Sequence, residues 1–262
     1  MEMLLPEQES MVEAITVQGV NLGYGNATIL ENMDFSIRSG EIVTVLGGSG
    51  CGKSTLLKAL IGLLKPHEGR ILVCGLDITG EDSLDTLALV RRKIGVLFQG
   101  GALLGSLTLG ENVGLPIQEF TKLPKDLIDD IVRLKLEMVH LAEYSNYLPA
   151  ELSGGMRKRA SLARAIALDP QILFCDEPSS GLDPVTAAGL DQLLIELNKS
   201  LHITMVVITH ELASIETISH RCIMLDKEAR GIIAIGTPWE LKSNNNDPKI
   251  HAFFHRQALE AS

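Results

Sequence analysis

Apolar and polar side chains alternate along the first forty residues in the way that β-strands require. The alternation runs over residues 13–20 and returns over residues 35–38, with a glycine-rich stretch at 23–26 between them. We therefore predict an antiparallel β-meander at the start of the chain. The next apolar stretch, residues 42–46, does not alternate, which is typical of a parallel strand buried on both faces.

The apolar period becomes helical after Gly101. Five apolar side chains in this part of the chain are spaced by four and three residues, as on one face of a helix: Leu127, Ile131, Leu134, Met138 and Leu141. We predict that the region from about 105 to 168 is wholly helical.

Strand patterns return in the C-terminal half. Residues 172–175 and 205–208 are short apolar runs that end on polar residues, and the segment 186–199 between them has a helical pattern. Two strands with a helix between them form the βαβ unit of a parallel sheet.

The end of the chain completes the predicted domain. Residues 223–225 and 231–234 predict a closing hairpin, and residues 244–262 are expected to form a C-terminal tail with a polar turn and a short helix around 250–257. The fold class is therefore α/β, with one domain over residues 13–243. We expect a mostly parallel core sheet, an antiparallel β subdomain and the helical subdomain described above.

Composition excludes several classes of protein. Of 262 residues, 45% are hydrophobic and 21% charged, which is typical of a folded globular chain. The net charge of −10 argues against general nucleic-acid binding, because phosphate neutralisation needs a basic surface. No run reaches the ~18 apolar residues of a membrane span, and the acidic N-terminus lacks the features of a signal peptide. The four cysteines are Cys51, Cys74, Cys175 and Cys222, and no two of them form a C-x-x-C pair. We therefore expect neither a zinc site nor a redox motif, and we expect the protein to be in a reduced cytosol.

A phosphate-binding loop follows the apolar strand 42–46. Eight residues match the pattern G-x-x-x-x-G-K-[ST]: Gly47, Gly48, Ser49, Gly50, Cys51, Gly52, Lys53 and Ser54. In this loop, backbone N–H groups and a helix N-terminus surround phosphate oxygens. Lys53 would reach the β- and γ-phosphates, and Ser54 would offer its hydroxyl to Mg²⁺, with Thr55 next in the predicted helix over 53–64. We therefore expect ATP and Mg²⁺ as ligands. A bulky adduct on Cys51 would occupy space that ATP needs.

Two acidic residues end the apolar strand 172–175. Asp176 would hold the metal of a phosphate-loop enzyme, and Glu177 would polarise a water molecule for attack on the γ-phosphate. An apolar strand that ends in two acids is, taken alone, usually a solvated strand end. The phosphate loop earlier in the chain makes the catalytic interpretation the stronger one.

A second anion site is predicted before a basic helix. Ser153 is a helix N-cap followed by Gly154 and Gly155, whose N–H groups lie at a helix start, although an ordinary capped helix has the same pattern. With this segment, residues 152–156, the chain resembles the nucleotide-binding subunits of ATP-binding cassette (ABC) transporters, whose signature is LSGGQ. Met156 departs from the usual glutamine, which we expect to tune activity rather than abolish it.

Four further family marks occur in order, so that the resemblance covers residues 13 to about 240. They are an N-terminal aromatic, a glutamine after a strand, the D-loop at 180–183 and a histidine that ends a strand: Tyr24, Gln99, Asp183 and His210. The resemblance implies that Tyr24 stacks on adenine, that Gln99 contacts the metal and takes part in catalysis, that Asp183 lies at the nucleotide and that His210 is catalytic. The alternatives are a surface aromatic, a loop amide and an ordinary strand-end histidine. Gly181 replaces the family's common alanine.

The resemblance also implies partners. In the family, each nucleotide is held between the P-loop of one subunit and the signature of the other, so Lys53 and Ser153 imply a homodimer. A single cassette without a membrane span implies that the permease is a separate integral-membrane polypeptide. DNA-repair members carry a long coiled-coil insertion and translation factors carry two cassettes in one chain, and this sequence has neither feature.

The segment after Gln99 suggests a subclass. Residues 98–108, rich in glycine and leucine, together with residues 151–156, resemble the Mla-type, MCE-linked phospholipid transport ATPases. That resemblance implies a phospholipid substrate, an MlaE-like permease, an MlaD-like MCE-domain protein and often an MlaB-like STAS-domain protein. It also implies a peripheral location on the cytoplasmic face of the inner membrane. An importer of amino acids or another small solute is the alternative, and a mobile loop is the alternative explanation of residues 98–108.

Overall fold

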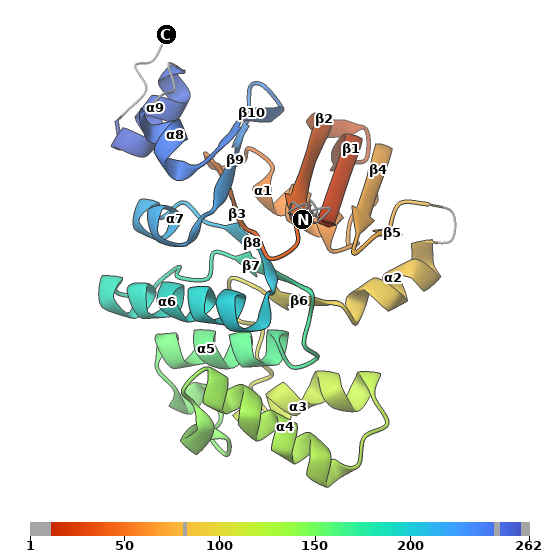
Figure 1. The fold of residues 1–262 in the computed structure, drawn as a ribbon, viewed down its shortest axis with the longest axis vertical. Helices are drawn as coiled ribbons and strands as arrows, with labels where there is room; N and C mark the ends of the chain where they lie inside the picture. Colours follow the sequence, from red (N-terminus) through yellow and green to blue (C-terminus); the bar gives the residue numbers. More distant parts are fainter. Residues whose placement is uncertain (1–11, 81–82, 244–246, 258–262) are drawn as a thin grey trace, which may run out of the picture.

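A computed structural model describes residues 12–80, 83–243 and 247–257. Its strands form a four-stranded antiparallel sheet in the order β2-β1-β4-β5 and a six-stranded, mostly parallel sheet in the order β10-β9-β3-β8-β7-β6 (Figure 1). The strands are β1 (Glu13–Tyr24), β2 (Ala27–Arg38), β3 (Ile42–Gly47), β4 (Glu68–Val73), β5 (Leu76–Asp77), β6 (Ile94–Leu97), β7 (Ile172–Asp176), β8 (Thr204–Ile208), β9 (Arg221–Asp226) and β10 (Gly231–Gly236).

All regular secondary structure between residues 105 and 168 is helical, as predicted. Within the described part of the chain, no helix is both long and apolar enough to cross a membrane. The helices are α1 (Lys53–Leu60), α2 (Ser83–Arg91), α3 (Leu109–Phe120), α4 (Lys125–Met138), α5 (Gly154–Ala165), α6 (Pro184–Leu201), α7 (Leu212–Ile218), α8 (Pro238–Ser243) and α9 (Pro248–His255), with single 3₁₀ turns at Ala142–Tyr144 and Pro149–Glu151.

The strand β3 occupies the middle of the larger sheet. It pairs in parallel with β8 on one side and β9 on the other, and all six of its residues are buried. The uninterrupted apolar pattern predicted this environment correctly. The βαβ unit β7-α6-β8, the meander β1-β2 and the closing hairpin β9-β10 are also present as predicted.

Residue alternation along the parallel strands separates two hydrophobic cores. Ile172 and Phe174 of β7 pack with α1 and the antiparallel sheet. Leu173 and Cys175, on the opposite face of the same strand, pack with α3, α4, α5 and α6. Successive side chains of a strand point to opposite faces, so α1 and α5 lie on opposite faces of the sheet (Figure 1).

The buried face of α4 differs from the predicted one. Leu127 and Leu134 are 44% and 53% exposed, and Leu141 lies beyond the end of the helix. The face that packs into the subdomain is centred on Ile128, Val132 and Leu136, and the half-buried Ile131 and Met138 pack beside them. Leu127 and Leu134 also have helical spacing, but packing of α4 against α3 and α5 buries Ile128, Val132 and Leu136. Ile131, Met138 and Leu141 pack against the same core as predicted, so the predicted face was wrong for Leu127 and Leu134.

The C-terminal helix α9 packs against the larger sheet rather than projecting from it. Ile250 and Phe254 share a core cluster with Leu46 of β3 and Met224 of β9. The helix begins at Pro248, after an Asp247 cap, two residues earlier than predicted. The predicted polar turn falls partly on residues 244–246, which lie outside the described residues.

Candidate functional site

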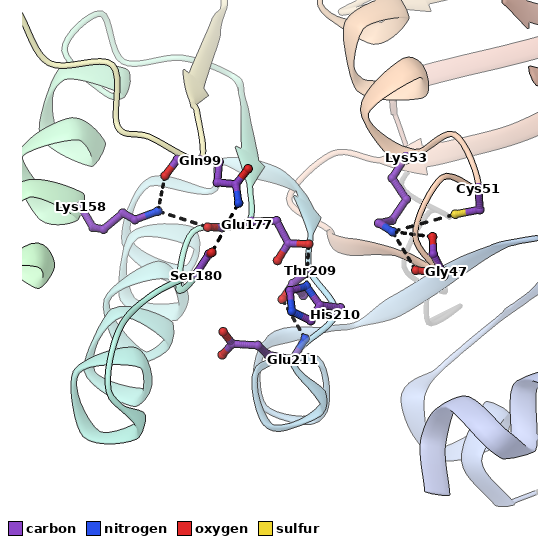
Figure 2. Close-up of polar contacts among 11 residues, drawn as sticks. Gly47, Cys51, Lys53, Gln99, Lys158, Glu177, Ser180, Thr209, His210 and Glu211 are labelled. Atoms are coloured by element: carbon purple, nitrogen blue, oxygen red, sulfur yellow. Dashed lines mark hydrogen bonds and ion pairs between the residues drawn. The ribbon is translucent and has the colours of Figure 1, made fainter. Parts of the chain in front are cut away.

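The carboxyl ends of four parallel strands bring most of the predicted site together. β6, β7, β8 and β3 are neighbours in the sheet and run in the same direction, so the segments that follow them leave from one edge. These segments carry Lys53, Gln99, Glu177 and His210, which Figure 2 shows along this edge. Ligands of open α/β sheets bind at such an edge.

Two glycines give the loop after β3 its shape. Gly47 has φ of 143°, and a Cβ atom there would lie 2.4 Å from the carbonyl oxygen of Leu225. Gly52 has φ of 103°, and its Cβ would lie 2.8 Å from Cγ of Leu30. Any larger residue would therefore be both strained and crowded. The three residues at the tip of the loop are exposed: Gly48, Ser49 and Gly50.

The start of α1 is arranged to receive an anion. The N-cap residue Gly52 supplies no side-chain bond to the helix, so the first N–H groups keep their hydrogen-bonding capacity and the positive end of the helix dipole. The Lys53 Nζ donates to the carbonyl oxygens of Gly47 at 2.7 Å and Gly48 at 3.1 Å. These are bonds that a phosphate oxygen can replace. Ser54 is exposed beside this cation, whereas Thr55 is buried.

The Cys51 side chain of the phosphate loop is buried. It is 2% exposed and belongs to the core cluster under α1. The thiol also lies 4.0 Å from the Lys53 Nζ. That an adduct on Cys51 blocks ATP stays a prediction, and the burial of the thiol adds that it reacts slowly.

Cys51 is accordingly expected to react slowly with a bulky maleimide in the native protein, because the loop must open to expose the thiol. Labelling should speed up sharply in denaturant. The measurement is the labelling rate at Cys51 by peptide mapping, with half-buried Cys74 as the internal comparison. Labelling of Cys51 as fast as that of Cys74 would contradict the buried position.

A close carboxylate–imidazole pair lies beside this loop. Oε1 of Glu177 is 2.8 Å from Nδ1 of His210, and Oε2 is buried with no hydrogen-bond partner among the residues that the structure describes. The Glu177 side chain is 13% exposed and the His210 side chain is 64% exposed, so the carboxylate is largely shielded from solvent and the imidazole faces it. A carboxylate with a free oxygen, held in place through its other oxygen, suits a base that orients water.

The surroundings of Asp176 act in opposite directions on the pKa of its carboxyl group. Burial raises the pKa of its carboxyl group, the negative charge of Glu177 raises it further, and the cations Lys158 and Lys53 oppose both effects. Within the described residues, no three His, Cys, Asp or Glu side chains cluster to form a metal cage. An ion held by a few protein oxygens together with substrate phosphates is the mode of binding typical of Mg²⁺. Asp176, Ser54 and Gln99 offer such oxygens.

Gln99 is attached to the neighbouring segments. Its side-chain Nε2 donates to Oγ of Ser180 at 3.5 Å, and its backbone carbonyl oxygen accepts from the Lys158 Nζ at 2.5 Å. The residue therefore connects the end of β6 to the D-loop and to helix α5 (Figure 2). That its amide contacts the metal stays a prediction, and the link to Lys158 was not foreseen.

Tyr24 lies at the end of β1 and is 47% exposed. The Lys58 Nζ donates to its hydroxyl at 3.3 Å and lies 5.6 Å from its ring centroid. Lys58 belongs to α1, so this aromatic ring is next to the helix that begins at the phosphate loop. An exposed ring in this position is compatible with stacking on a base.

Ser153 caps helix α5, where its Oγ accepts from the N–H of Met156 at 3.3 Å. Gly154 and Gly155 begin the helix, and a Cβ on Gly155 would lie 2.5 Å from Cγ2 of Thr186. Gly155 therefore allows α5 to approach α6 closely. Ser153 precedes Lys158 by five residues, which is roughly 7.5 Å along the helix axis. Lys158 contacts Gln99 at the strand edge, and α5 lies on the face of the sheet opposite α1.

Asp183 caps helix α6. It accepts from the backbone N–H groups of Val185 and Thr186, both at 3.1 Å, and from Oγ1 of Thr186 at 2.5 Å. The hydroxyl bond from Thr186 is the largest cause that lowers the pKa of Asp183. Gly181 in the same loop has φ of 78°, a left-handed conformation that explains glycine in place of alanine.

Sequence reasoning missed Lys158. It is 8% exposed and contacts the backbone of two predicted site residues, Gln99 and Glu177. The available signal was its helical spacing of three and four residues from Ser161 and Leu162, which places a lysine on a buried face.

Comparisons with known proteins agree with this geometry. A family model described as ABC transporter matches residues 30–180. The probable ribonucleotide transport ATP-binding protein mkl of Mycobacterium leprae (strain TN) is 43% identical over 94% of this chain and 70% of that protein. The intermembrane phospholipid transport system ATP-binding protein MlaF of Escherichia coli (strain K12) is 38% identical over 94% of this chain and 90% of that protein.

Solved structures match as well. The cbiO1 subunit of the ABC transporter complex cbiONQ from Clostridium perfringens has a TM-score of 0.80 and 29% identity, with coverage of 88% of this chain and 91% of that one. A dimeric ATP-binding cassette, MJ0796, bound to ADP and Pi, has a TM-score of 0.76 and 31% identity, with coverage of 86% and 98%. The resemblance and the fold class predicted from the sequence are thereby confirmed. This chain belongs to the ABC transporter family and is an ATPase of that family.

Proposed function

We propose that this chain energises phospholipid transport through a separate membrane permease. The observation that carries the proposal is the alignment with MlaF, an intermembrane phospholipid transport ATP-binding protein, over nearly the whole length of both chains. The name of the mycobacterial relatives, which refers to ribonucleotide transport, makes a small-solute substrate the second candidate.

The proposed chemistry assigns a role to each residue at the strand edge. Lys53 binds the β- and γ-phosphates together with the backbone of the phosphate loop, and Tyr24 stacks on adenine. Mg²⁺ supplies positive charge to the phosphate oxygens and would be held by Ser54, Asp176 and Gln99. Each of these residues stabilises the bound nucleotide before hydrolysis.

Glu177 is the proposed general base. Its unpartnered Oε2 accepts a proton from the attacking water, while the bond from His210 to Oε1 keeps the carboxylate in one orientation. Orientation by a second residue is valuable because the attacking oxygen must lie in line with the bond that breaks.

A homodimer follows from the position of Ser153. In one chain this residue and Lys53 belong to helices on opposite faces of the sheet, which separates the two anion sites. A second copy related by a two-fold axis would place its Ser153, Gly154 and Gly155 against the nucleotide on Lys53, with Asp183 near the same interface. The dimeric cassette among the structural relatives supports this arrangement.

The proposed partners are those of an Mla-type complex: an MlaE-like integral-membrane permease, an MlaD-like MCE-domain protein and an MlaB-like STAS-domain protein. The chain would lie peripherally on the cytoplasmic face of the inner membrane.

Co-purification with the tagged permease, followed by mass spectrometry of bound lipid, tests the function. Phospholipid vesicles containing the complex should show ATP-dependent lipid movement and lipid-stimulated ATP hydrolysis, and ribonucleotides should stimulate neither. Transport of a ribonucleotide without any lipid movement would reject the phospholipid proposal in favour of the second candidate.

The loop after Gln99 is the proposed docking site of the permease. The Leu104 side chain is 45% exposed, while its backbone N–H and carbonyl are both bonded to the amide of Asn112, at 2.8 and 3.1 Å. Asn112 is fully buried and holds the loop in a defined shape. The leucine is therefore a surface residue on a fixed backbone, as a contact point requires.

Leu104→Asp is accordingly expected to leave ATP affinity of the isolated chain unchanged while recovery with the tagged permease drops. Burial of apolar surface contributes ~25 cal/mol per Å², and a buried unpaired carboxylate opposes it. The matched control is Leu84→Asp on α2, at a leucine that is 81% exposed. Normal recovery of the Leu104 variant would exclude this loop as the docking site.

A further inference from the structure

One face of helix α5 holds the loop that follows β6. The Lys158 Nζ donates to the backbone carbonyl oxygen of Gln99 at 2.5 Å. Six residues later in the helix, Arg164 donates to the backbone carbonyls of Gly101 at 3.0 Å and Ala102 at 2.6 Å. Between them, Oγ of Ser161 lies 2.5 Å from where a Cβ of Gly101 would be. The loop that carries Gln99 is therefore bound tightly to the helix that begins at Ser153.

Lys158 also contacts the catalytic strand end. Its Nζ donates to the carbonyl oxygen of Glu177 at 3.3 Å. Glu177 has φ of 47°, a left-handed conformation that is unfavourable for a residue with a side chain. The N–H of Glu177 donates to Ile208 at 2.9 Å, and the N–H of Ser180 donates to the Glu177 carbonyl at 3.2 Å. Lys158 thus adds a side-chain cation to the contacts of the Glu177 backbone.

The nearest partners of this ammonium are neutral carbonyls, not carboxylates. Burial lowers the pKa of Lys158, and the negative charges of Asp176 and Glu177 are the largest effects that raise it. A buried cation is costly unless its donors are satisfied and negative charge is near. At Lys158 both conditions are met by residues of the hydrolysis site.

Lys135 of α4 shows what a purely structural buried lysine is like in this protein. It is 3% exposed, and its Nζ lies 2.5 Å from the Asp169 carboxylate. That pair joins α4 to the turn before β7, away from the strand edge that carries Glu177. Lys158 has similar burial but different partners.

We propose that Lys158 is a positioning residue for ATP hydrolysis. It donates to the backbone carbonyls of Gln99 and Glu177 at once and so fixes the positions of both residues relative to α5, the helix that Ser153 caps. A partner subunit's nucleotide that contacts Ser153 would thus act on the same rigid helix that positions Gln99 and Glu177. This inference rests on the proposed roles of Gln99 and Glu177.

The test compares Lys158→Met, Lys158→Arg and the matched control Lys135→Met in the full chain assembled with its permease. For Lys158→Met we expect kcat to fall about tenfold or more, because small displacements of catalytic groups are costly, while KM and ATP affinity stay within about threefold. Lys158→Arg should recover much of the rate, and Lys135→Met should hydrolyse ATP like the wild type.

Hydrogen exchange of the same variants gives a readout that does not depend on activity. Peptides covering residues 98–104 and 176–180 should exchange faster in Lys158→Met than in the wild type and Lys135→Met. The proposal is overturned if kcat of Lys158→Met stays within twofold of wild type, if Lys135→Met loses as much, if arginine is no better than methionine, or if exchange in both segments is unchanged. A wild-type complex that does not hydrolyse ATP would reject the proposed function itself.

Discussion

Glu177→Gln is expected to bind ATP with near-normal affinity and to lose hydrolysis by about 100-fold or more, the typical contribution of a general base. Glutamine keeps the shape of the side chain and an oxygen that can accept from His210, so the geometry of the pair survives. What disappears is the proton acceptor at the buried Oε2 position. The variant should therefore accumulate the ATP-bound dimer.

The measurements are single-turnover hydrolysis in the assembled complex and the dimer fraction of the isolated chain by size-exclusion chromatography with ATP. Glu211→Gln is the matched control, because it makes the same change at the residue after His210, which is the N-cap of α7 and follows the adjacent strand β8. Wild-type turnover by Glu177→Gln would remove Glu177 from the role of base. Equal loss in both variants would show that any lost charge near His210 has this effect.

Lys53→Ala is expected to weaken ATP binding itself. The Nζ now bonds to the carbonyls of Gly47 and Gly48, and exchanging these for phosphate oxygens creates charge-assisted hydrogen bonds. Loss of such bonds costs about 1.5–3 kcal/mol, which corresponds to roughly 10- to 150-fold in affinity. Hydrolysis at saturating ATP should also fall, since the γ-phosphate loses a cation.

Equilibrium titration of the isolated chain with a fluorescent ATP analogue measures this effect. Lys65→Ala removes the same type of side chain from an exposed position shortly after α1 and should change affinity little. Unaltered affinity in Lys53→Ala would mean that the lysine bonds to its own loop in the ATP complex too, and the phosphate role would be withdrawn.

Local patterns predicted most of the framework. The unbroken apolar run at 42–46 identified a strand buried on both faces, and the acids and histidine that end later apolar runs identified the strand edge that gathers the site. These patterns are reliable because parallel strands share one direction, so residues that follow them meet at one edge. The phosphate loop needed only its own spacing and the elements on either side.

The residues that face the core of α4 were outside the reach of such reasoning. Leu127 and Ile128 belong to two overlapping stripes of helical spacing, and nothing within the helix prefers one. Packing against α3 and α5 buried Ile128 and left Leu127 44% exposed. The orientation of the Cys51 side chain into the core has the same cause, because a loop motif specifies its backbone and not the side on which a thiol packs.

The sequence by itself thus determined the order of the elements, the phosphate loop and the carboxylate and histidine that stand at the strand ends, since each depends on neighbours within a few residues. Only the tertiary structure decided that Lys158 reaches Gln99 across 59 positions of the chain and Glu177 across 19. It also decided the left-handed backbone of Glu177. Contacts of this kind depend on how helices and sheet pack in space, and no periodicity of a single segment records them.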